Sequence, residues 1–381
     1  MDNTNLQISI NRIVAKLHAF DAGNGVNEYY CTFTGGDPEQ TFAGQLENML
    51  ACCREIQESG FYGHLPGLRQ ARPVFKRYFL SDAANQAPLL RTVTGEEYCA
   101  VSVIQQPPLD GCKVAMTVLL MSGTENRKWS AHLYQVSHHG YDELWSTQHT
   151  AEGQEAFTQT YRLLDNYARL LEQHRCTLAE NCIRTWLYVN DIDNHYDGVV
   201  RARNTVFDAE QLTDDTHYIA STGIQGRAAD PHTLCMMNAV AIRGLRPGQQ
   251  RHLYASDRMN RTSDYGVRFE RGVCLDFDGR RRVYVSGTAS IDHQGRIVHP
   301  GDIRRQVQRM WENVDALLAE AGCDRDDIAE ILVYLRDPAD YAAVEQMFCN
   351  AFPSTPRLLL HAPVCRPGWL VEMECVAVKT K

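Results

Sequence analysis

The 381-residue sequence predicts an α+β protein built from three similar modules in one chain. Three segments carry this prediction: RYFLSDAAN, TWLYVNDIDN and ILVYLRDPAD each end an apolar strand in an acidic turn and stand at the same point of a repeated unit. Each unit consists of an amphipathic helix, a β-branched strand, a second helical stretch and a closing apolar strand. We expect each module to be a mixed sheet with helices on one face, and the three sheets to pack around a pseudo-threefold axis, as three identical chains would.

The elements keep the same order in each unit. In the third unit, apolar periodicity predicts a helix over 302–322, a strand over 328–337, a helical stretch over 338–352 and a closing strand over 371–378. The middle unit has its elements at 156–174, 182–191, 195–207 and 235–242, and the first unit, the weakest match, at 42–57, 74–82, an irregular segment around Asn85 and Leu90, and 113–121. We therefore expect modules at 1–127, 128–250 and 251–381. A chance alignment of unrelated strands and helices is the alternative, which the constant order disfavours.

Composition narrows the class of protein. The formal charge of −9 disfavours a general affinity for nucleic acid or anionic lipid, and no run of about 18 apolar residues predicts a membrane span. Thirteen cysteines without a CxxC pair are typical of small buried apolar residues in a cytoplasmic protein, not of a disulfide framework. The histidines lack metal-ligand spacing such as HExxH, and the isolated GNG at 23–25 is too short for a dinucleotide loop. We expect neither a metal nor a cofactor.

The closing strands indicate where acid–base chemistry can take place. Aligning KVAMTVLLM and CMMNAVAI with VEMECVAV places Ala115 and Met236 opposite Glu372. Neither of these residues can transfer a proton, so the alignment predicts one working site per chain, in the third module. Glu374 points to the same face of the strand as Glu372, and alternation alone cannot decide which carboxyl is the acid.

Candidate ligand-binding residues surround this strand in the sequence. Arg357 stands fifteen residues before Glu372 across a Pro/Gly turn, which suggests a clamp for a substrate carboxylate beside a proton donor. His361 shares a strand face with Arg357 and is a possible second titrating group, although a structural histidine is the simpler interpretation. Cys365 lies in the turn APVCRPGW, where backbone amides could bind an oxyanion; a turn without chemistry is the equal alternative.

A second segment, rich in arginines and aromatic residues, precedes the strand VYVSGTASID. It interleaves Arg261, Arg268 and Arg271 with Tyr265 and Phe269. This combination suits the binding of a carboxylated ring by charge and stacking, with a solvated loop of paired charges as the alternative. Gly287 in the following turn allows a ligand to approach the backbone.

At these residues the chain resembles the Rid superfamily, also called YjgF or endoribonuclease L-PSP. VYVSGTASID, FPSTPR and VEMECVAV match that family's strand-Ser-Gly, Pro-to-Arg and IEIEAIAV-like segments, in order, over about 265–379. The resemblance implies chorismate-mutase-like (YjgF-like) modules, with Arg357 as the substrate-carboxylate arginine and Glu372 as the water-orienting glutamate. Phe269 stands where many Rid deaminases have a tyrosine.

The long three-module form, with SGTASI followed by HPGD and with RTWLYV and ASTGIQG, is more similar to the chorismatases over about 180–379. That resemblance implies that Arg357 and Arg268 hold carboxylates and that Glu372 protonates an enol ether. It also implies that Tyr196, Tyr265 and Arg203 line a ring pocket. The compact loop YGVRFERG departs from the longer, proline-rich loop of that family.

The sequence thus predicts a small-molecule hydrolase or lyase that acts on a carboxylated enol ether such as chorismate and releases pyruvate. A Rid-type enamine or imine deaminase is one alternative, and a metabolite-binding protein without turnover is another. The expected partner is a small carboxylated metabolite, with no nucleic acid and no membrane. A chain that carries its own three modules needs no partner chains to form the trimer, so we expect a monomer or a loose dimer.

Overall fold

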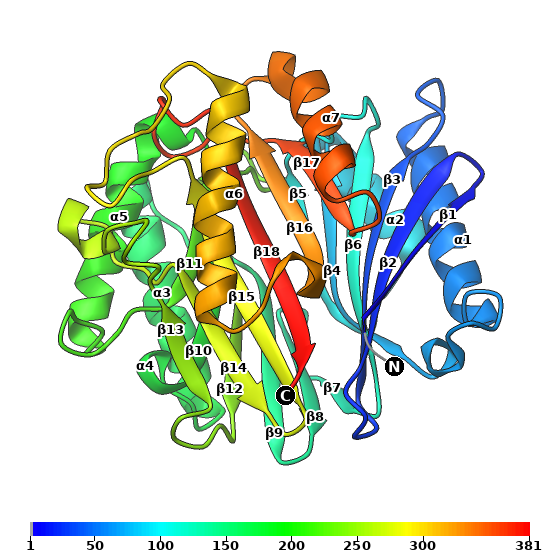
Figure 1. The fold of residues 1–381 in the computed structure, drawn as a ribbon, viewed down its shortest axis with the longest axis horizontal. Coiled ribbons are helices and arrows are strands. Elements are labelled where there is room, and N and C mark those ends of the chain that lie inside the picture. The colour runs from blue at the N-terminus through cyan, green and yellow to red at the C-terminus, as the bar shows by residue number, and fades with distance from the viewer. Residues whose placement is uncertain (1–2) are drawn as a thin grey trace.

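The computed structural model describes residues 3–381, apart from the side chains of Pro66 and Tyr265. Three six-stranded mixed sheets are arranged around a common centre, with the helices at the periphery (Figure 1). The first module contains β1 (Thr4–Ile10), β2 (Ile13–Asp21), β3 (Asn27–Gly35), α1 (Phe42–Ser59), β4 (Arg72–Leu80), α2 (Ala83–Thr94), β5 (Ala100–Gln105) and β6 (Val114–Ser122). The second contains β7 (Glu125–Lys128), β8 (Leu133–His138), β9 (Tyr141–His149), α3 (Ala156–Gln173), α4 (Leu178–Asn181), β10 (Cys182–Val189), α5 (Ile192–Ala209), β11 (Ala220–Gln225) and β12 (Cys235–Arg243). The third contains β13 (Gln250–Leu253), β14 (Gly272–Phe277), β15 (Arg280–Ala289), α6 (Ile303–Glu320), β16 (Ile328–Leu335), α7 (Tyr341–Ala351), β17 (Arg357–His361) and β18 (Val371–Thr380).

The three sheets share one topology, which confirms the predicted fold of three repeated modules. Their strand orders are β1-β2-β3-β6-β4-β5, β7-β8-β9-β12-β10-β11 and β13-β14-β15-β18-β16-β17. In each sheet the last two strands of this order, β4–β5, β10–β11 and β16–β17, pair in parallel, and the next pair inward is antiparallel. The sequence repeat missed the strands that open each module, because their mixed polar and apolar residues repeat less regularly than the buried closing strands.

The chain passes from one sheet to the next at 123–124 and at 244–249. Module boundaries that follow the sheets therefore lie a few residues before the predicted cuts at 127/128 and 250/251. The exact boundaries stay a prediction.

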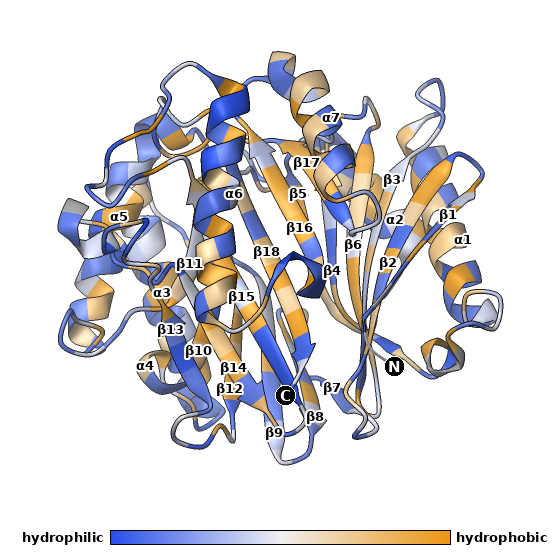
Figure 2. Cartoon of the chain, in the orientation of Figure 1, coloured by the Kyte–Doolittle hydropathy of each residue, from blue (hydrophilic) through white to orange (hydrophobic). Residues whose placement is uncertain are grey.

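Local sequence explains the helices. Asp302 Oδ1 accepts a hydrogen bond from the backbone N–H of Arg305 (3.1 Å) and caps the start of α6, and Thr41 caps α1 in the same way. The buried residues of α6, among them Val307, Met310 and Leu317, form one stripe against the sheet. Figure 2 shows this separation of apolar and polar residues on α6 and along the strands.

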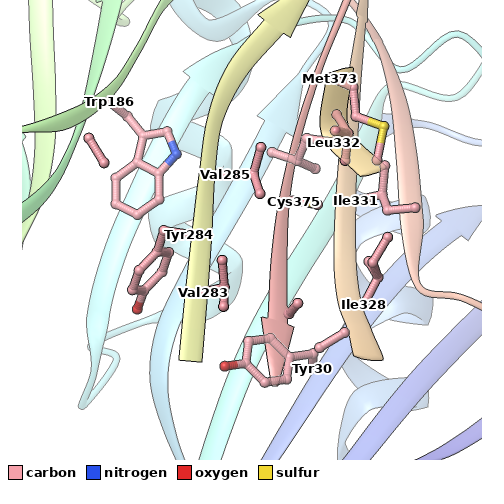
Figure 3. Close-up of a cluster of buried hydrophobic side chains, with 14 of the residues drawn as sticks. Tyr30, Trp186, Val283, Tyr284, Val285, Ile328, Ile331, Leu332, Met373 and Cys375 are labelled. Carbon is pink, nitrogen blue, oxygen red and sulfur yellow. The ribbon is translucent and has the colours of Figure 1, made fainter. Parts of the chain in front are cut away.

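The third sheet is buried on both of its faces. In the third sheet, Val283 and Val285 lie on one side of β15 with Cys375 of β18, whereas Tyr284 lies on the other side near Trp186 of the second module (Figure 3). The first side packs beneath the helices and the second faces the centre of the molecule. A sheet buried on both faces explains the nearly continuous apolar runs of the closing strands.

Charged residues at the centre connect the three modules. Arg282 of β15 is fully buried and bridges Glu28 of β3 (Nη2 to Oε1, 2.7 Å) and Glu143 of β9 (Nη1 to Oε2, 2.8 Å). Burial by itself raises the pKa of Glu143, but the Arg282 guanidinium, His138 and Arg280 together outweigh burial and hold this pKa well below its ordinary value. Arg280 also pairs with both carboxylates, so two cations of the third module hold a carboxylate from each of the other two.

Glu374 of β18 forms the converse arrangement. Its carboxylate accepts hydrogen bonds from Arg184 Nη2 (2.8 Å) and Trp186 Nε1 (2.8 Å) of the second module, and it contacts Arg77 Nη1 (3.3 Å) of the first. Here one anion of the third module holds a cation from each of the other two.

The modules meet in a ring. The edge strand of each sheet lies against the third strand of the next sheet: β5 against β9, β11 against β15, and β17 against β3. We name the resulting clefts the 1–2, 2–3 and 3–1 clefts after the modules that form them.

Two further properties concern the residues the structure describes. None of the helices in 3–381 is both long and apolar enough to span a membrane. All thirteen cysteines are free, and eleven of them are buried, the exceptions being Cys349 and Cys365.

Candidate active site

Strand register confirms the alignment of the closing strands. Glu372 pairs with Tyr334, Met236 with Tyr188, and Ala115 with Phe79, each at the same position of the equivalent strand pair. Because a residue and its cross-strand partner point to the same face, the three positions are equivalent in space as well as in sequence. Of the three, the third module alone has a carboxyl group.

Glu372 lines a narrow cavity in the 2–3 cleft and is 5% exposed. Burial, assisted by the neighbouring Glu374 carboxylate, raises the pKa of Glu372 to about 8. Gly287 of β15 permits this position, because a Cβ atom there would lie 2.8 Å from Cδ of Glu372. At neutral pH the site therefore contains a protonated carboxyl group.

Two buried arginines line the cavity together with Glu372. Arg203 on α5 is 2% exposed, and its Nε and Nη2 atoms are buried without a hydrogen-bond partner among the described residues. Arg271 is also buried, and its Nη2 donates to the backbone oxygen of Asn260 (3.1 Å). The Phe269 ring lies between the guanidinium groups, with Cζ of Arg203 at 6.0 Å and Cζ of Arg271 at 5.7 Å from its centroid. An unsatisfied buried guanidinium suits a carboxylate ligand, which would supply the missing acceptors.

The remaining walls are mostly apolar and come from both modules. Tyr196 of α5 and Gly223 of β11 belong to the second module, and Cys365 and Trp369 belong to the turn before β18. The cavity has a volume of about 40 Å³, room for about three water molecules. A ring-sized ligand therefore requires the cavity to widen.

The predicted pairing of Arg357 with Glu372 is wrong, because the two side chains lie on opposite faces of the third sheet. Arg357 pairs with Ile331 and Glu372 with Tyr334, and residues three apart in a strand point in opposite directions. Arg357 lines the 3–1 cleft, where its Nη2 donates to Glu345 Oε1 (2.9 Å). His361 shares the face of Arg357 and does not line the cavity of Glu372.

Pseudo-symmetry explains the error. Thr185 stands three residues before Tyr188 in β10, as Ile331 stands three before Tyr334 in β16, and Thr185 pairs with Ser221. Ser221 of β11 thus occupies, in the 2–3 cleft, the position that Arg357 occupies in the 3–1 cleft. The acid and the strand arginine belong to neighbouring clefts.

Two further predicted residues lie elsewhere. Arg268 points away from the cavity, pairs with Asp208 and donates to the backbone oxygen of Asn204 (3.2 Å). Glu374 is engaged at the centre of the molecule, as described above, and does not line the cavity. The side chain of Tyr265 lies outside the described residues. The structure does bring together Glu372, Phe269, Gly287, Cys365, Arg203 and Tyr196.

Of the three arginines that the sequence interleaves with Tyr265 and Phe269, Arg271 lines the cavity. Arg366 of the Cys365 turn and Ser221, which the sequence analysis did not select, line it as well. Alternation could have identified Arg271, since it shares the parity of Phe269 and Arg268 does not. Ser221 has no chemical signal in the sequence, and its place follows from the packing of β11 against β15. Among the described residues, no group of three or more His, Cys, Asp and Glu is placed to bind a metal ion.

Comparison with known proteins places these features in a family. The family model for Endoribonuclease L-PSP matches residues 268–379. A RutC family protein of Pyrococcus abyssi is 32% identical over 99 residues, which are 26% of this chain and 78% of that protein. The 3-aminoacrylate deaminase RutC of Acinetobacter baylyi is 33% identical over 97 residues, 25% of this chain and 77% of that protein. A crystal structure of chorismatase superposes with a TM-score of 0.62 at 19% identity, covering 80% of this chain and 93% of that one.

Fold and cleft together define a single-chain pseudo-trimer of YjgF-like modules. The chain belongs to the Rid/YjgF (endoribonuclease L-PSP) superfamily. The similarity to chorismatase extends over all three modules and shows a shared fold.

Proposed function

We propose that the protein is a hydrolase or lyase that protonates a small carboxylated enol ether, in the manner of a chorismatase, and releases pyruvate. One observation carries the proposal: a carboxyl group with a pKa of about 8 faces the unsatisfied buried guanidinium of Arg203 in one cavity. A general acid works best when its pKa lies near the working pH.

Each step of the proposed hydrolysis can be assigned to residues that line the cavity. With the substrate carboxylate against Arg203 and Arg271, Glu372 gives its proton to the terminal CH₂ carbon of the enol ether. The π electron pair forms the new C–H bond and leaves an oxocarbenium ion, which the Glu372 carboxylate stabilises. Water adds to this ion and returns a proton to Glu372. The hemiketal then breaks its C–O bond, and its hydroxyl proton passes to the departing alkoxide oxygen, which gives pyruvate and an alcohol. One water molecule is consumed in each turnover.

The second candidate is a Rid-type deaminase acting on a small enamine or imine. The volume of about 40 Å³ favours it, since a three-carbon substrate needs less widening of the cavity than a ring does. The relative from Acinetobacter baylyi is named for 3-aminoacrylate. The same proton donor and carboxylate site would serve this reaction, whose products are ammonia and a carbonyl compound.

A substrate panel tests the proposal. Purified protein is incubated with chorismate, with 2-aminoacrylate and with 3-aminoacrylate generated in solution, and pyruvate and ammonia are measured above the uncatalysed rate. We expect pyruvate from chorismate. Ammonia from an aminoacrylate without pyruvate from chorismate would select the deaminase. Turnover of none of them would contradict both reactions and favour a metabolite-binding protein.

Replacing Arg203 by Met tests the carboxylate site. The change keeps the length of the side chain and removes the charge, so we expect KM for the substrate found in the panel to rise by roughly ten- to a hundredfold, with a smaller change in kcat. Arg203→Lys should recover part of the loss. Arg201→Met on the same helix removes an exposed arginine and serves as the control. An unchanged KM in Arg203→Met would contradict the assignment.

A further inference from the structure

The second module forms a surface cavity by itself, with no residue from the other two modules. The cavity has a volume of about 320 Å³, and its lining comes from β7, β8, β9, the end of α3 and the end of β12. We name it the outer cavity. Its volume is at the lower end of the range typical of small-molecule sites.

The lining of the outer cavity carries an excess of positive charge, although the whole chain is acidic. It contains three arginines, Arg127, Arg175 and Arg243, and one carboxylate, Asp142. Arg243 and Asp142 neutralise each other, since Arg243 Nε donates to Asp142 Oδ2 (3.1 Å). Arg127 and Arg175 form no ion pair with the rest of the described chain. Two positive charges therefore remain for a ligand.

Arg127 is held in place by stacking, which leaves its hydrogen-bonding groups available. Its Cζ lies 3.4 Å from the centroid of the Trp129 ring. Trp129 is itself fixed, because its Nε1 donates to Gln135 Oε1 (2.9 Å) and its ring meets the His174 ring edge-on, with the centroids 5.0 Å apart. A guanidinium that stacks on an indole keeps the N–H groups in its own plane free for an anion.

His174 shows that the arginine charges converge in the cavity. Burial, and then the charges of Arg243 and Arg127, lower the pKa of His174. Both guanidinium groups therefore act on the same point, where an anion is stabilised by the charges that disfavour a protonated imidazole.

Arg175 stands at a backbone position where the other two modules have glycine. It follows the last turn of α3 in the left-handed conformation (φ 59°), and Gly60 (φ 57°) and Gly322 (φ 72°) occupy the equivalent positions after α1 and α6. In all three modules the next residue donates its backbone N–H to the carbonyl five residues earlier. Glycine is favoured at such a position because it has no Cβ. Arginine there strains the backbone, as is common at binding sites, and brings a charged side chain to the cavity.

The third module neutralises the cations that it has in the equivalent region. Strand register places Arg281 and Lys379 opposite each other, as it does Asp142 and Arg243 in the second module. Arg281 pairs with Asp276 (2.7 Å), and Lys379 pairs with Asp327 (3.0 Å). An excess of unpaired cations here is therefore not a general property of the fold.

We propose that the outer cavity binds the phosphate group of a small phosphate ester, held by Arg127 and Arg175 beside the Arg243–Asp142 pair. A phosphate ester of this kind carries about 1.5 to 2 negative charges at neutral pH, with three acceptor oxygens, and so matches the two unpaired cations. A carboxylate carries a single charge and would leave one of these cations unneutralised. This site lies outside the 2–3 cleft and does not depend on the reaction proposed there.

Calorimetric titration of the full chain with phenyl phosphate, with inorganic phosphate and with benzoate tests the proposal. We expect phenyl phosphate and inorganic phosphate to bind, and benzoate not to displace phenyl phosphate. Arg127→Gln should weaken the binding of phenyl phosphate by roughly tenfold or more. Trp129→Leu should weaken it by roughly three- to tenfold, because it removes the surface that orients Arg127 without removing a charge.

Arg175→Gly separates a loss of ligand contact from a loss of folding. The change introduces the residue of the other two modules, so we expect a higher midpoint of urea unfolding together with a roughly three- to tenfold weaker binding of phenyl phosphate. Higher stability with unchanged affinity would exclude Arg175 from the site and contradict the proposal.

Matched controls separate binding at the outer cavity from a general charge effect and from binding in the 2–3 cleft. Arg201→Gln removes an exposed arginine on α5 of the same module, and Arg203→Met removes the arginine of the 2–3 cleft; neither should change the affinity for phenyl phosphate. The proposal fails if phenyl phosphate does not bind, if Arg127→Gln leaves its affinity unchanged, or if Arg203→Met abolishes its binding. Displacement of phenyl phosphate by an equal concentration of benzoate would overturn the assignment to phosphate. Binding of inorganic phosphate alone would overturn the assignment to an ester.

Discussion

Glu372→Gln is expected to lower turnover by about 10²- to 10⁴-fold, the range that a positioned general acid contributes. Glutamine keeps the size and hydrogen-bonding capacity of the protonated side chain but does not act as an acid. Substrate affinity should change little, because Arg203 and Arg271 remain in place. The measurement is single-turnover kinetics together with a binding titration of the variant, and full activity in Glu372→Gln would refute the role of this residue.

The pH dependence follows from the same group. Glu372 has a raised pKa of about 8, so the protonated, active form predominates below this value and the rate falls as pH rises through it. Glu374→Gln, on the same strand face, tests whether the Glu374 carboxylate contributes to the raised pKa of Glu372. Removing that negative charge lowers the pKa of Glu372, so the fall in rate should begin at a lower pH. A profile that does not move would show that the two carboxyls are not coupled.

Arg282→Met is expected to destabilise the fold by about 3–5 kcal/mol, because it leaves two buried carboxylates, Glu28 and Glu143, with Arg280 as their one remaining shared arginine. Methionine fills a similar volume, which limits the loss of packing. The measurement is the shift of the urea midpoint at neutral pH.

Arg305→Met is the control for Arg282→Met. Arg305 is exposed and only distantly paired with Asp302 (3.7 Å), so its loss should change the stability by less than about 1 kcal/mol. Equal midpoints for Arg282→Met and the unchanged protein would show that the bridge between modules adds no stability.

The parts of the fold that follow from sequence are those in which burial imposes a regular pattern. The closing strands are apolar on both faces, and α6 has a single apolar stripe, so the repeat and the equivalence of Glu372 with Ala115 could be read directly. The strands β7 and β13 are short and partly exposed, and their sequences ENRK and QRHL contain no comparable pattern.

Strand patterns could identify site residues of the third module, whereas Arg203 and Tyr196 of the second module followed only from the resemblance to a family. Gly287 and Glu372 lie on the neighbouring strands β15 and β18, Phe269 lies in the segment before β14, and all three line the cavity. Arg357 is close to Glu372 in sequence, but the pairing of β17 and β18 with β16 places the two on opposite faces. Ser221 comes from another module, and packing of two sheets decides its position.

Covalent linkage of the three modules has a consequence for how the clefts can differ. In a symmetric trimer of identical chains, any substitution appears in all three clefts at once, so a change that improves one alters every copy. Here β11 and β17 carry different residues at the same position, and β6, β12 and β18 do likewise. One cleft can therefore keep an acid, a second can keep a cation, and a third, with Met236 and Val101 at these positions, can keep neither, while the shared centre still holds the assembly together.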